Sequence, residues 1–333
     1  MKENILENKL YPVEQVVDFI NQGYLMSLAG DERLLAQLPE GNWVAGTIPY
    51  FMDKEKNIFT RDLINVNFLG KDAEDFVIKT YDADNIETFP RDGFDNGFTF
   101  LIIPALTEVH KSFAIKAQDM EDLYDNPVVG WISGIDLNST DIPKVFDGTS
   151  ASSYPDKAVA IHVKLPENMF AQLEIINIFE QDPESPEIRF FTDNFEVVNC
   201  LIDGEEKNLA EYIAENQIDT KLPLVADYTG ASINVSIKEV DPEHGIVGFY
   251  APVFSDKVYR FAKPIHNYEQ VFGDRLREYA EINSQFACNC ILNYLYGELE
   301  GKKTGNLSGP ITFGEVAYQL LNQTFVIMTI EKL

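Results

Sequence analysis

The sequence is poor in the residues on which catalytic and metal sites are usually built. It has three cysteines, Cys200, Cys288 and Cys290, and four scattered histidines. The cysteines form neither a Cys-x-x-Cys pair nor an even-numbered disulfide framework, and no two histidines have a metal-ligand spacing. A Walker loop, a Gly-x-Gly-x-x-Gly run and a Gly-x-Ser-x-Gly elbow are also missing. These absences argue against a metal centre, nucleotide binding and hydrolase chemistry.

Positive charge and long apolar runs are also scarce. Lys and Arg number 26 against 54 Asp and Glu, a formal net charge of −28. A field of this sign repels nucleic acid and anionic membrane surfaces, so we expect neither as a partner. No run approaches the roughly 18 apolar residues of a membrane span, and residues 1–10 do not have the pattern of a signal peptide. Free thiols in such a chain predict a cytoplasmic location.

Apolar side chains, by contrast, are plentiful enough for a large folded core. Hydrophobic residues make up 45% of the chain and aromatic residues 12%, with 23 Phe and 15 Tyr. Their burial can offset the entropy lost on folding, so we do not expect global disorder. A chain of 333 residues is too long for one simple core, which predicts two lobes.

The hydrophobic pattern predicts an α/β (α+β) fold with mixed sheets. Residues 99–103, 106–117 and 128–132 have the periodicity of a strand, a helix and a strand, an order typical of parallel pairing. Residues 43–51 and 58–68 alternate well enough to be expected as the two strands of a hairpin.

Two parts of the chain share a short pattern. Leu38-Pro-Glu-Gly-Asn-Trp-Val-Ala-Gly-Thr and Leu307-Ser-Gly-Pro-Ile-Thr-Phe-Gly-Glu each place a Leu-x-x-Gly or Leu-x-Gly turn before a strand with a second Gly. Internal duplication would explain this similarity. Chance is the other explanation, because patterns of about ten residues recur easily.

The C-terminal segment holds the strongest candidate for a binding site. Residues 268–285 are predicted to form the longest helix, which leads into the Cys288 and Cys290 segment. Further on, Phe313-Gly314-Glu315 combines a glycine that allows close backbone approach with a carboxylate acceptor. The alternative is that Gly314 makes a tight turn and Glu315 occupies the first turn of a helix.

The two C-terminal cysteines have a spacing that places both on one side of a strand. They could hold a soft metal only with further ligands, and no histidine lies closer in sequence than His266. A catalytic thiolate would need a basic neighbour, which the sequence does not supply. We therefore interpret them as buried small apolar residues and expect neither a metal nor a catalytic residue.

In chain order, these segments resemble FIST sensory domains over residues 24–331. The matching phrases are Leu38-Pro39 with Val44-Ala45-Gly46-Thr47, Pro127-Val-Val-Gly-Trp, Val145-Phe-Asp-Gly, Leu201-Ile-Asp-Gly204, the Cys288–Cys290 segment, and Phe313-Gly314-Glu315. The resemblance implies two lobes with mixed sheets flanked by helices. It divides the chain into a helical lead-in at 1–23, an N-terminal lobe at 24–220 and a C-terminal lobe at 221–333.

FIST domains are bacterial signal-transduction modules, so the resemblance implies a non-enzymatic cytoplasmic sensor. A small ligand such as an amino acid would bind in a pocket between the lobes, and a separate signalling protein would supply the output. The family's cysteine segment usually continues to an Arg, where Asn293 stands here; Asn lacks the bidentate fork that binds a carboxylate. The implied ligand-binding residues are Gly46, Thr47, Cys290, Asn293, Phe313, Gly314 and Glu315.

Three other functions remain open from the sequence. Some FIST-type proteins resemble haem-binding nitric-oxide sensors, so one of His110, His162, His244 and His266 could be a haem ligand, and haem is the one cofactor considered. An enzyme using Cys288 or Cys290 is the second alternative. The third is a structural or interaction protein without a ligand.

Overall fold

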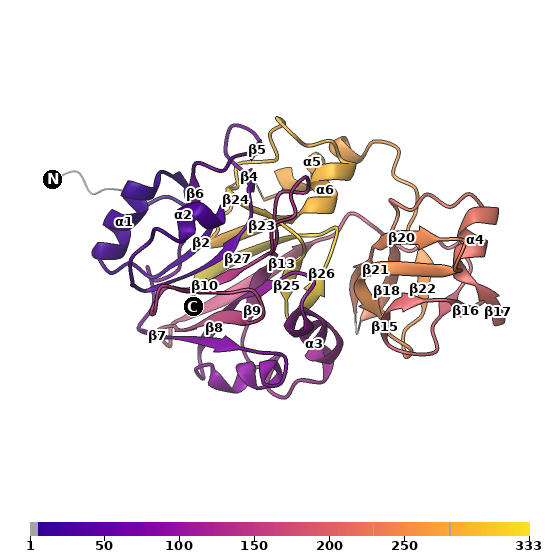
Figure 1. Ribbon diagram of the computed structural model, residues 1–333, viewed down its shortest axis with the longest axis horizontal. Coiled ribbons are helices and arrows are strands. Elements are labelled where there is room, and N and C mark those ends of the chain that lie inside the picture. The colour runs from indigo at the N-terminus through magenta and orange to yellow at the C-terminus, as the bar shows by residue number, and fades with distance from the viewer. Residues whose placement is uncertain (1–5, 229, 280) are drawn as a thin grey trace.

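The chain folds into two lobes that are connected by two crossings of the backbone (Figure 1). The structure, a computed structural model, describes residues 6–228, 230–279 and 281–333. The main lobe comprises residues 6–176 and 268–333, and the second lobe comprises residues 188–261. The boundary expected at residue 220 therefore lies inside the second lobe. The first five residues of the expected lead-in lie outside the described residues.

Within the described residues, the main lobe contains three six-stranded mixed sheets. The first has the order β1 (Lys9–Tyr11), β6 (Ile64–Phe68), β2 (Met26–Gly30), β3 (Trp43–Thr47), β10 (Val145–Asp147), β11 (Ser152–Tyr154). The second has the order β7 (Asp75–Tyr81), β12 (Ala158–Lys164), β8 (Gly97–Pro104), β9 (Val128–Ser133), β25 (Glu315–Ala317), β26 (Gln319–Leu321). The third has the order β13 (Met169–Ile176), β27 (Phe325–Lys332), β23 (Phe286–Cys290), β24 (Gly309–Thr312), β4 (Tyr50–Met52), β5 (Ile58–Phe59).

Each of these sheets has a parallel pair at its centre and antiparallel neighbours on both sides. The central strands are joined by the short helices α2 (Glu32–Leu35), α3 (Glu108–Lys116) and α6 (Ile291–Tyr296). A parallel connection needs such a crossover, because a tight turn can join only antiparallel strands. The parallel pairing predicted for residues 99–103 and 128–132 is confirmed, with Thr99 opposite Val128.

The strand order repeats three times along the chain, with one strand of each repeat exchanged. After β3, β9 and β24 the chain leaves its own sheet, so that β4 joins the third sheet, β10 the first and β25 the second. The strands β6, β12 and β27 then return to pair with β2, β8 and β23. The main lobe is thus a threefold repeat, and the second lobe is inserted between β13 and β23. The two similar phrases in the sequence include the equivalent strands β3 and β24.

The expected hairpin of residues 43–51 and 58–68 is wrong. Strand β2 lies between β3 and β6, and only β4 and β5 form a hairpin in this region. Pro49 interrupts the apolar run because it has no N–H to donate to a sheet. The helix expected at 268–285 is shorter, since α5 covers Tyr268–Arg277. Residue 280 lies outside the described residues.

In its described residues, the second lobe has two antiparallel sheets and one helix. Its larger sheet has the order β17 (Glu205–Asn208), β16 (Asn199–Ile202), β14 (Ile188–Arg189), β22 (Tyr259–Phe261), β18 (Leu224–Tyr228), β19 (Ala231–Val235). Its smaller sheet has the order β15 (Asn194–Val197), β21 (Ile246–Val253), β20 (Ile237–Asp241). The helices not yet named are α1 (Val13–Asn21), α4 (Leu209–Glu215), and the 3-10 helices η1 (Ile86–Asp92) and η2 (Ala117–Asp119). No helix in the described part of the chain is long and apolar enough to cross a membrane.

Glycines allow the three repeats to pack closely where the central strands end. A Cβ on Gly46 would lie 2.6 Å from the Trp131 ring, and one on Gly134 would lie 2.3 Å from the Phe313 ring. The N–H of Gly134 also donates to the carbonyl of Thr47 across this contact. Close packing between repeats therefore requires a glycine at position 46 and places Phe313 against Gly134. The mixed α/β architecture depends on this packing.

Two glycine substitutions test close packing within one repeat, where β9 lies against β8. A Cβ on Gly130 would lie 1.7 Å from the Leu101 carbonyl oxygen, which is backbone and cannot move aside. We expect Gly130→Ala to lower the free energy of unfolding by more than about 2 kcal/mol. Gly273→Ala is the control, because a Cβ at that helical position would meet open space. We expect this substitution to raise the free energy of unfolding by about 0.5–1 kcal/mol. Urea denaturation measures both; equal effects would contradict the packing argument.

Candidate functional site

Two cavities occupy corresponding places in the threefold repeat. Each lies where a central strand leads into its helix and meets a turn of the following repeat. The first, the acidic cavity, is lined by Gly30 at the end of β2, by Asp31–Arg33 after it and by Gly134–Asp136 after β9. The second, the inter-lobe cavity, is lined by Ala105 and Leu106 after β8 and by Phe313 after β24. Ligands of open α/β sheets bind at such carboxyl ends of strands.

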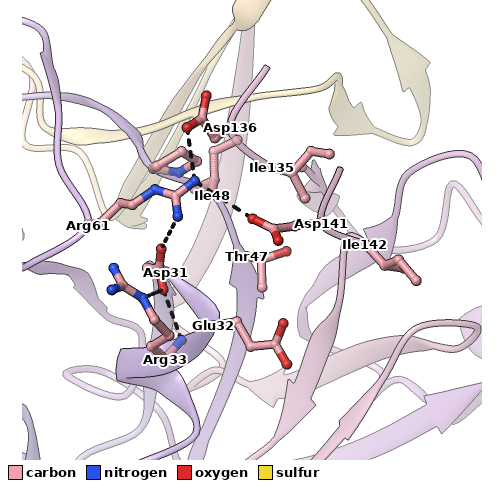
Figure 2. Close-up of a pocket in the computed structure, with 13 residues that line it drawn as sticks. Asp31, Glu32, Arg33, Thr47, Ile48, Arg61, Ile135, Asp136, Asp141 and Ile142 are labelled. Atoms are coloured by element: carbon pink, nitrogen blue, oxygen red, sulfur yellow. Dashed lines mark hydrogen bonds and ion pairs between the residues drawn. The ribbon is translucent and has the colours of Figure 1, made fainter. Parts of the chain in front are cut away.

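The acidic cavity is filled by its own ion pairs. Figure 2 shows the Arg61 guanidinium among three carboxylates. It lies 2.9 Å from Asp136, 3.6 Å from Asp31 and 3.7 Å from Asp141. The Asn138 N–H and then Arg61 hold the pKa of Asp136 below its ordinary value. The remaining volume is about 120 Å³, so this cluster satisfies itself and leaves little room for a ligand.

The inter-lobe cavity is larger, mostly apolar and shared by the two lobes. Its volume is about 240 Å³, equivalent to roughly eight water molecules in the liquid. The main lobe contributes α6 with Leu292 and Leu295, and the second lobe contributes Phe195 and Phe249. Concave apolar sites at lobe interfaces are typical of small-molecule binding, commonly with about 300–1,000 Å³ for drug-sized ligands. This cavity fits a smaller molecule and is too small for a haem macrocycle.

His110 supplies one buried polar group in the lining. The Thr107 hydroxyl caps α3 by accepting the His110 N–H, which places the ring in the first turn of the helix. The Leu106 N–H donates to His110 Nδ1 at 3.3 Å, and burial lowers the pKa of the ring to about 4. The neutral ring therefore carries its proton on Nε2. This atom is buried and has no partner among the residues that the structure describes.

Asn322 supplies the second buried polar group, from the turn after β26. Its Oδ1 accepts the backbone N–H of Ser236 at 2.8 Å, and its backbone carbonyl accepts the side-chain amide of Asn234 at 3.3 Å. The Asn322 Nδ2 is buried and also has no partner within the described ranges. Two lining residues thus each carry an N–H donor that has no acceptor among residues 6–228, 230–279 and 281–333.

Lysines outnumber carboxylates in the cavity lining. Lys111 and Lys238 line it together with a single carboxylate, Glu196. Their Nζ atoms lie 3.0 Å from Glu108 and 3.3 Å from Glu239. Each lysine is therefore paired with a carboxylate beside the lining, so these charged groups carry no excess of positive charge.

Four of the site residues predicted from the sequence lie at the ends of the central strands. Phe313 lines the inter-lobe cavity, and Thr47 lines the acidic cavity, where its hydroxyl accepts the Lys144 N–H. Gly46 is buried against Trp131. Gly314 has a φ of +149°, which favours glycine, and packs against Leu320. The structure therefore brings one of these four to the inter-lobe cavity.

The other three predicted residues are buried close by in the third repeat. Burial, followed by the charge of Glu315, raises the pKa of Cys290 well above its ordinary value, so that it stays a thiol. Asn293 uses its whole amide within the protein, accepting from the Tyr268 hydroxyl and donating to Asn289 and Thr324. These contacts leave neither side chain available to a ligand in the present arrangement.

Glu315 is fully buried on β25, not in a helix. Its two oxygens accept hydrogen bonds from the hydroxyls of Thr312 at 3.2 Å and Thr324 at 2.6 Å. Burial nevertheless raises its pKa to about 8. The alternative expected from the sequence, a place in the first turn of a helix, is wrong, because the chain after Gly314 continues as a strand that pairs with β9.

The sequence also singled out His162, but both of its ring nitrogens are engaged. Nε2 lies 2.9 Å from the Tyr81 hydroxyl, and Nδ1 lies 2.9 Å from the Thr99 hydroxyl. Neither nitrogen is available to a haem iron. For His110 the Thr-x-x-His spacing was the available signal, whereas nothing in the sequence pointed to Asn322 or to the second-lobe residues Phe195 and Phe249.

Glu315 makes stability depend on pH. Its folded pKa of about 8 lies above the ordinary value of 4.5, so the folded state holds the proton that the unfolded state loses. This contribution is complete below about pH 4.5 and is lost as pH rises through 8. Between about pH 5 and pH 9, the loss of this contribution should lower the free energy of unfolding of the wild type by about 4 kcal/mol. We expect the Glu315→Gln variant not to show this decrease. Urea denaturation at both pH values measures this; parallel pH profiles of variant and wild type would contradict it.

A comparison with protein-family models matches residues 11–331 to a family described as a family of unknown function, DUF6976. No curated protein matches the chain. The matched range runs from the end of β1 into β27 and includes both lobes and both cavities. The chain belongs to the DUF6976 family.

Proposed function

We propose that this protein is a non-enzymatic sensory module that binds a small ligand in the inter-lobe cavity, as its resemblance to FIST domains implies. One observation carries the proposal: the cavity is apolar, is lined by both lobes, and contains two buried N–H donors without an acceptor within the described residues. Unsatisfied buried donors are uncommon and destabilising in folded proteins, so a ligand acceptor would relieve them.

The chemistry of the nearby groups supports binding rather than conversion of the ligand. The thiols of Cys288 and Cys290 have pKa values raised by burial and are poor nucleophiles as neutral groups. His110 is neutral, because its pKa of about 4 keeps it from acting as a proton donor near neutral pH. All three cysteines are buried and free, which supports a reducing, cytoplasmic setting.

Contacts between the lobes suggest how binding would be transmitted. In the second lobe, the Asn234 side chain and the Ser236 backbone N–H donate hydrogen bonds to Asn322 of the main lobe, and the Ser236 hydroxyl donates to Gln323. Asn322 also lines the cavity, so a ligand that contacts it acts on the same residue that holds the second lobe. Binding would favour one arrangement of the lobes, and a separate signalling protein would recognise that arrangement.

A pair of tryptophan substitutions tests the cavity as the binding site. Leu295 lines it and Val271 lies on α5 outside its lining; each is 42% exposed. Thermal-shift screening uses hydrophobic amino acids and short-chain acids, alcohols and amines. A ligand at 100 times its Kd stabilises the wild type by about 2.7 kcal/mol. We expect Leu295→Trp to abolish that shift by filling the cavity, and Val271→Trp to retain it. Binding that survives Leu295→Trp, or no shift with any compound, would refute the proposal.

A further inference from the structure

We propose that the inter-lobe cavity binds a small apolar carboxylate that lacks an α-amino group, and that the carboxylate accepts hydrogen bonds from His110 Nε2–H and Asn322 Nδ2–H. This inference rests on the proposed function and specifies the chemistry of its ligand. It also proposes a ligand class that differs from the amino acids implied by the family resemblance.

The two lining side chains have their hydrogen-bonding roles assigned by contacts behind them. The Leu106 N–H occupies His110 Nδ1, so the other ring nitrogen of the neutral histidine is a donor. The Ser236 N–H occupies Asn322 Oδ1, so the free end of that amide is a donor as well. These two donors correspond in number and in hydrogen-bonding role to the two acceptor oxygens of a carboxylate.

The position of the His110 ring relates this donor pair to the apolar lining. The ring meets Phe195 of the second lobe edge-on, with 6.2 Å between the ring centroids. Both donor nitrogens are buried, so an acceptor reaches them when the lining shifts. An apolar body would then contact Phe249, Leu292 and Leu295, which lie in the same lining.

An α-ammonium group would find no buried carboxylate among the lining residues that the structure describes. The acceptor atoms of His110 and Asn322 are already used, and the single lining carboxylate, Glu196, is exposed. Burial of an ammonium without an acceptor is strongly unfavourable. Tyr250 also lines the cavity, and burial raises its pKa, so its hydroxyl keeps a proton to donate.

A series of ligands with one six-carbon chain and different head groups tests this chemistry. Isothermal titration calorimetry on the full chain would compare hexanoate, hexylamine, 1-hexanol and 2-aminohexanoate. We expect hexanoate to bind at least tenfold more tightly than hexylamine and 2-aminohexanoate. Equal or tighter binding of either amine would overturn the carboxylate assignment and leave the proposed binding function intact.

Two variants identify the donors. His110→Phe keeps a ring beside Phe195 but removes the Nε2–H. We expect it to lower the affinity for hexanoate at least tenfold and to change the affinity for 1-hexanol less than twofold. Asn322→Asp keeps the oxygen that holds Ser236 and replaces the donor with an acceptor, so it should weaken hexanoate by a similar factor. An unchanged preference for hexanoate over 1-hexanol in both variants would overturn the donor assignment.

Matched controls separate these effects from general destabilisation. Asn289→Asp alters another buried asparagine whose Nδ2 has no partner among the described residues, but which lies outside the cavity lining. His244→Phe alters an exposed histidine. Both should leave the hexanoate affinity unchanged. If none of the four compounds binds the wild type, the carboxylate inference fails; if the wider thermal-shift panel is also without effect, the proposed function fails with it.

Discussion

The exchange of one strand between repeats holds the main lobe together. A sheet edge without a partner leaves a row of N–H and C=O groups unpaired, and each central pair here is completed by a strand from another repeat. No repeat can close its own sheet, so the three must fold against one another. This dependence also explains why a whole second lobe can be inserted between β13 and β23, because the exchanged strands lie elsewhere in the chain.

The same exchange creates the two cavities. It brings the turn that follows one central pair to the end of the central strand of a neighbouring repeat, with glycines that allow the close approach of Gly134 to Phe313. Corresponding places then differ in their side chains and in the second lobe, which lines the inter-lobe cavity but not the acidic cavity. Arg61 and three carboxylates fill the first, whereas apolar residues and two unused donors line the second. Equivalent geometry with different chemistry is why we assign binding to one cavity alone.

Local sequence patterns predicted the elements better than their partners. The strand-helix-strand order at residues 99–132 was confirmed because periodicity and the Thr107 cap are local. The hairpin at 43–68 was wrong because β3 and β6 each prefer β2, a choice that depends on packing across the whole sheet. The FIST resemblance directed attention to Phe313, which does line the inter-lobe cavity, but most of its other implied residues are buried in the surrounding core.

The sequence by itself determined the mixed α/β elements, the strong negative charge and the absence of recognisable metal-ligand and nucleotide-binding motifs, since these follow from composition and short-range pattern. Only the tertiary structure decided the strand exchange, the extent of the second lobe and the two unused donors. The donor role of Asn322 depends on Ser236, which is 86 residues away in the chain. Hydrogen-bond partners at such separations are set by how the lobes pack, and no local pattern records them.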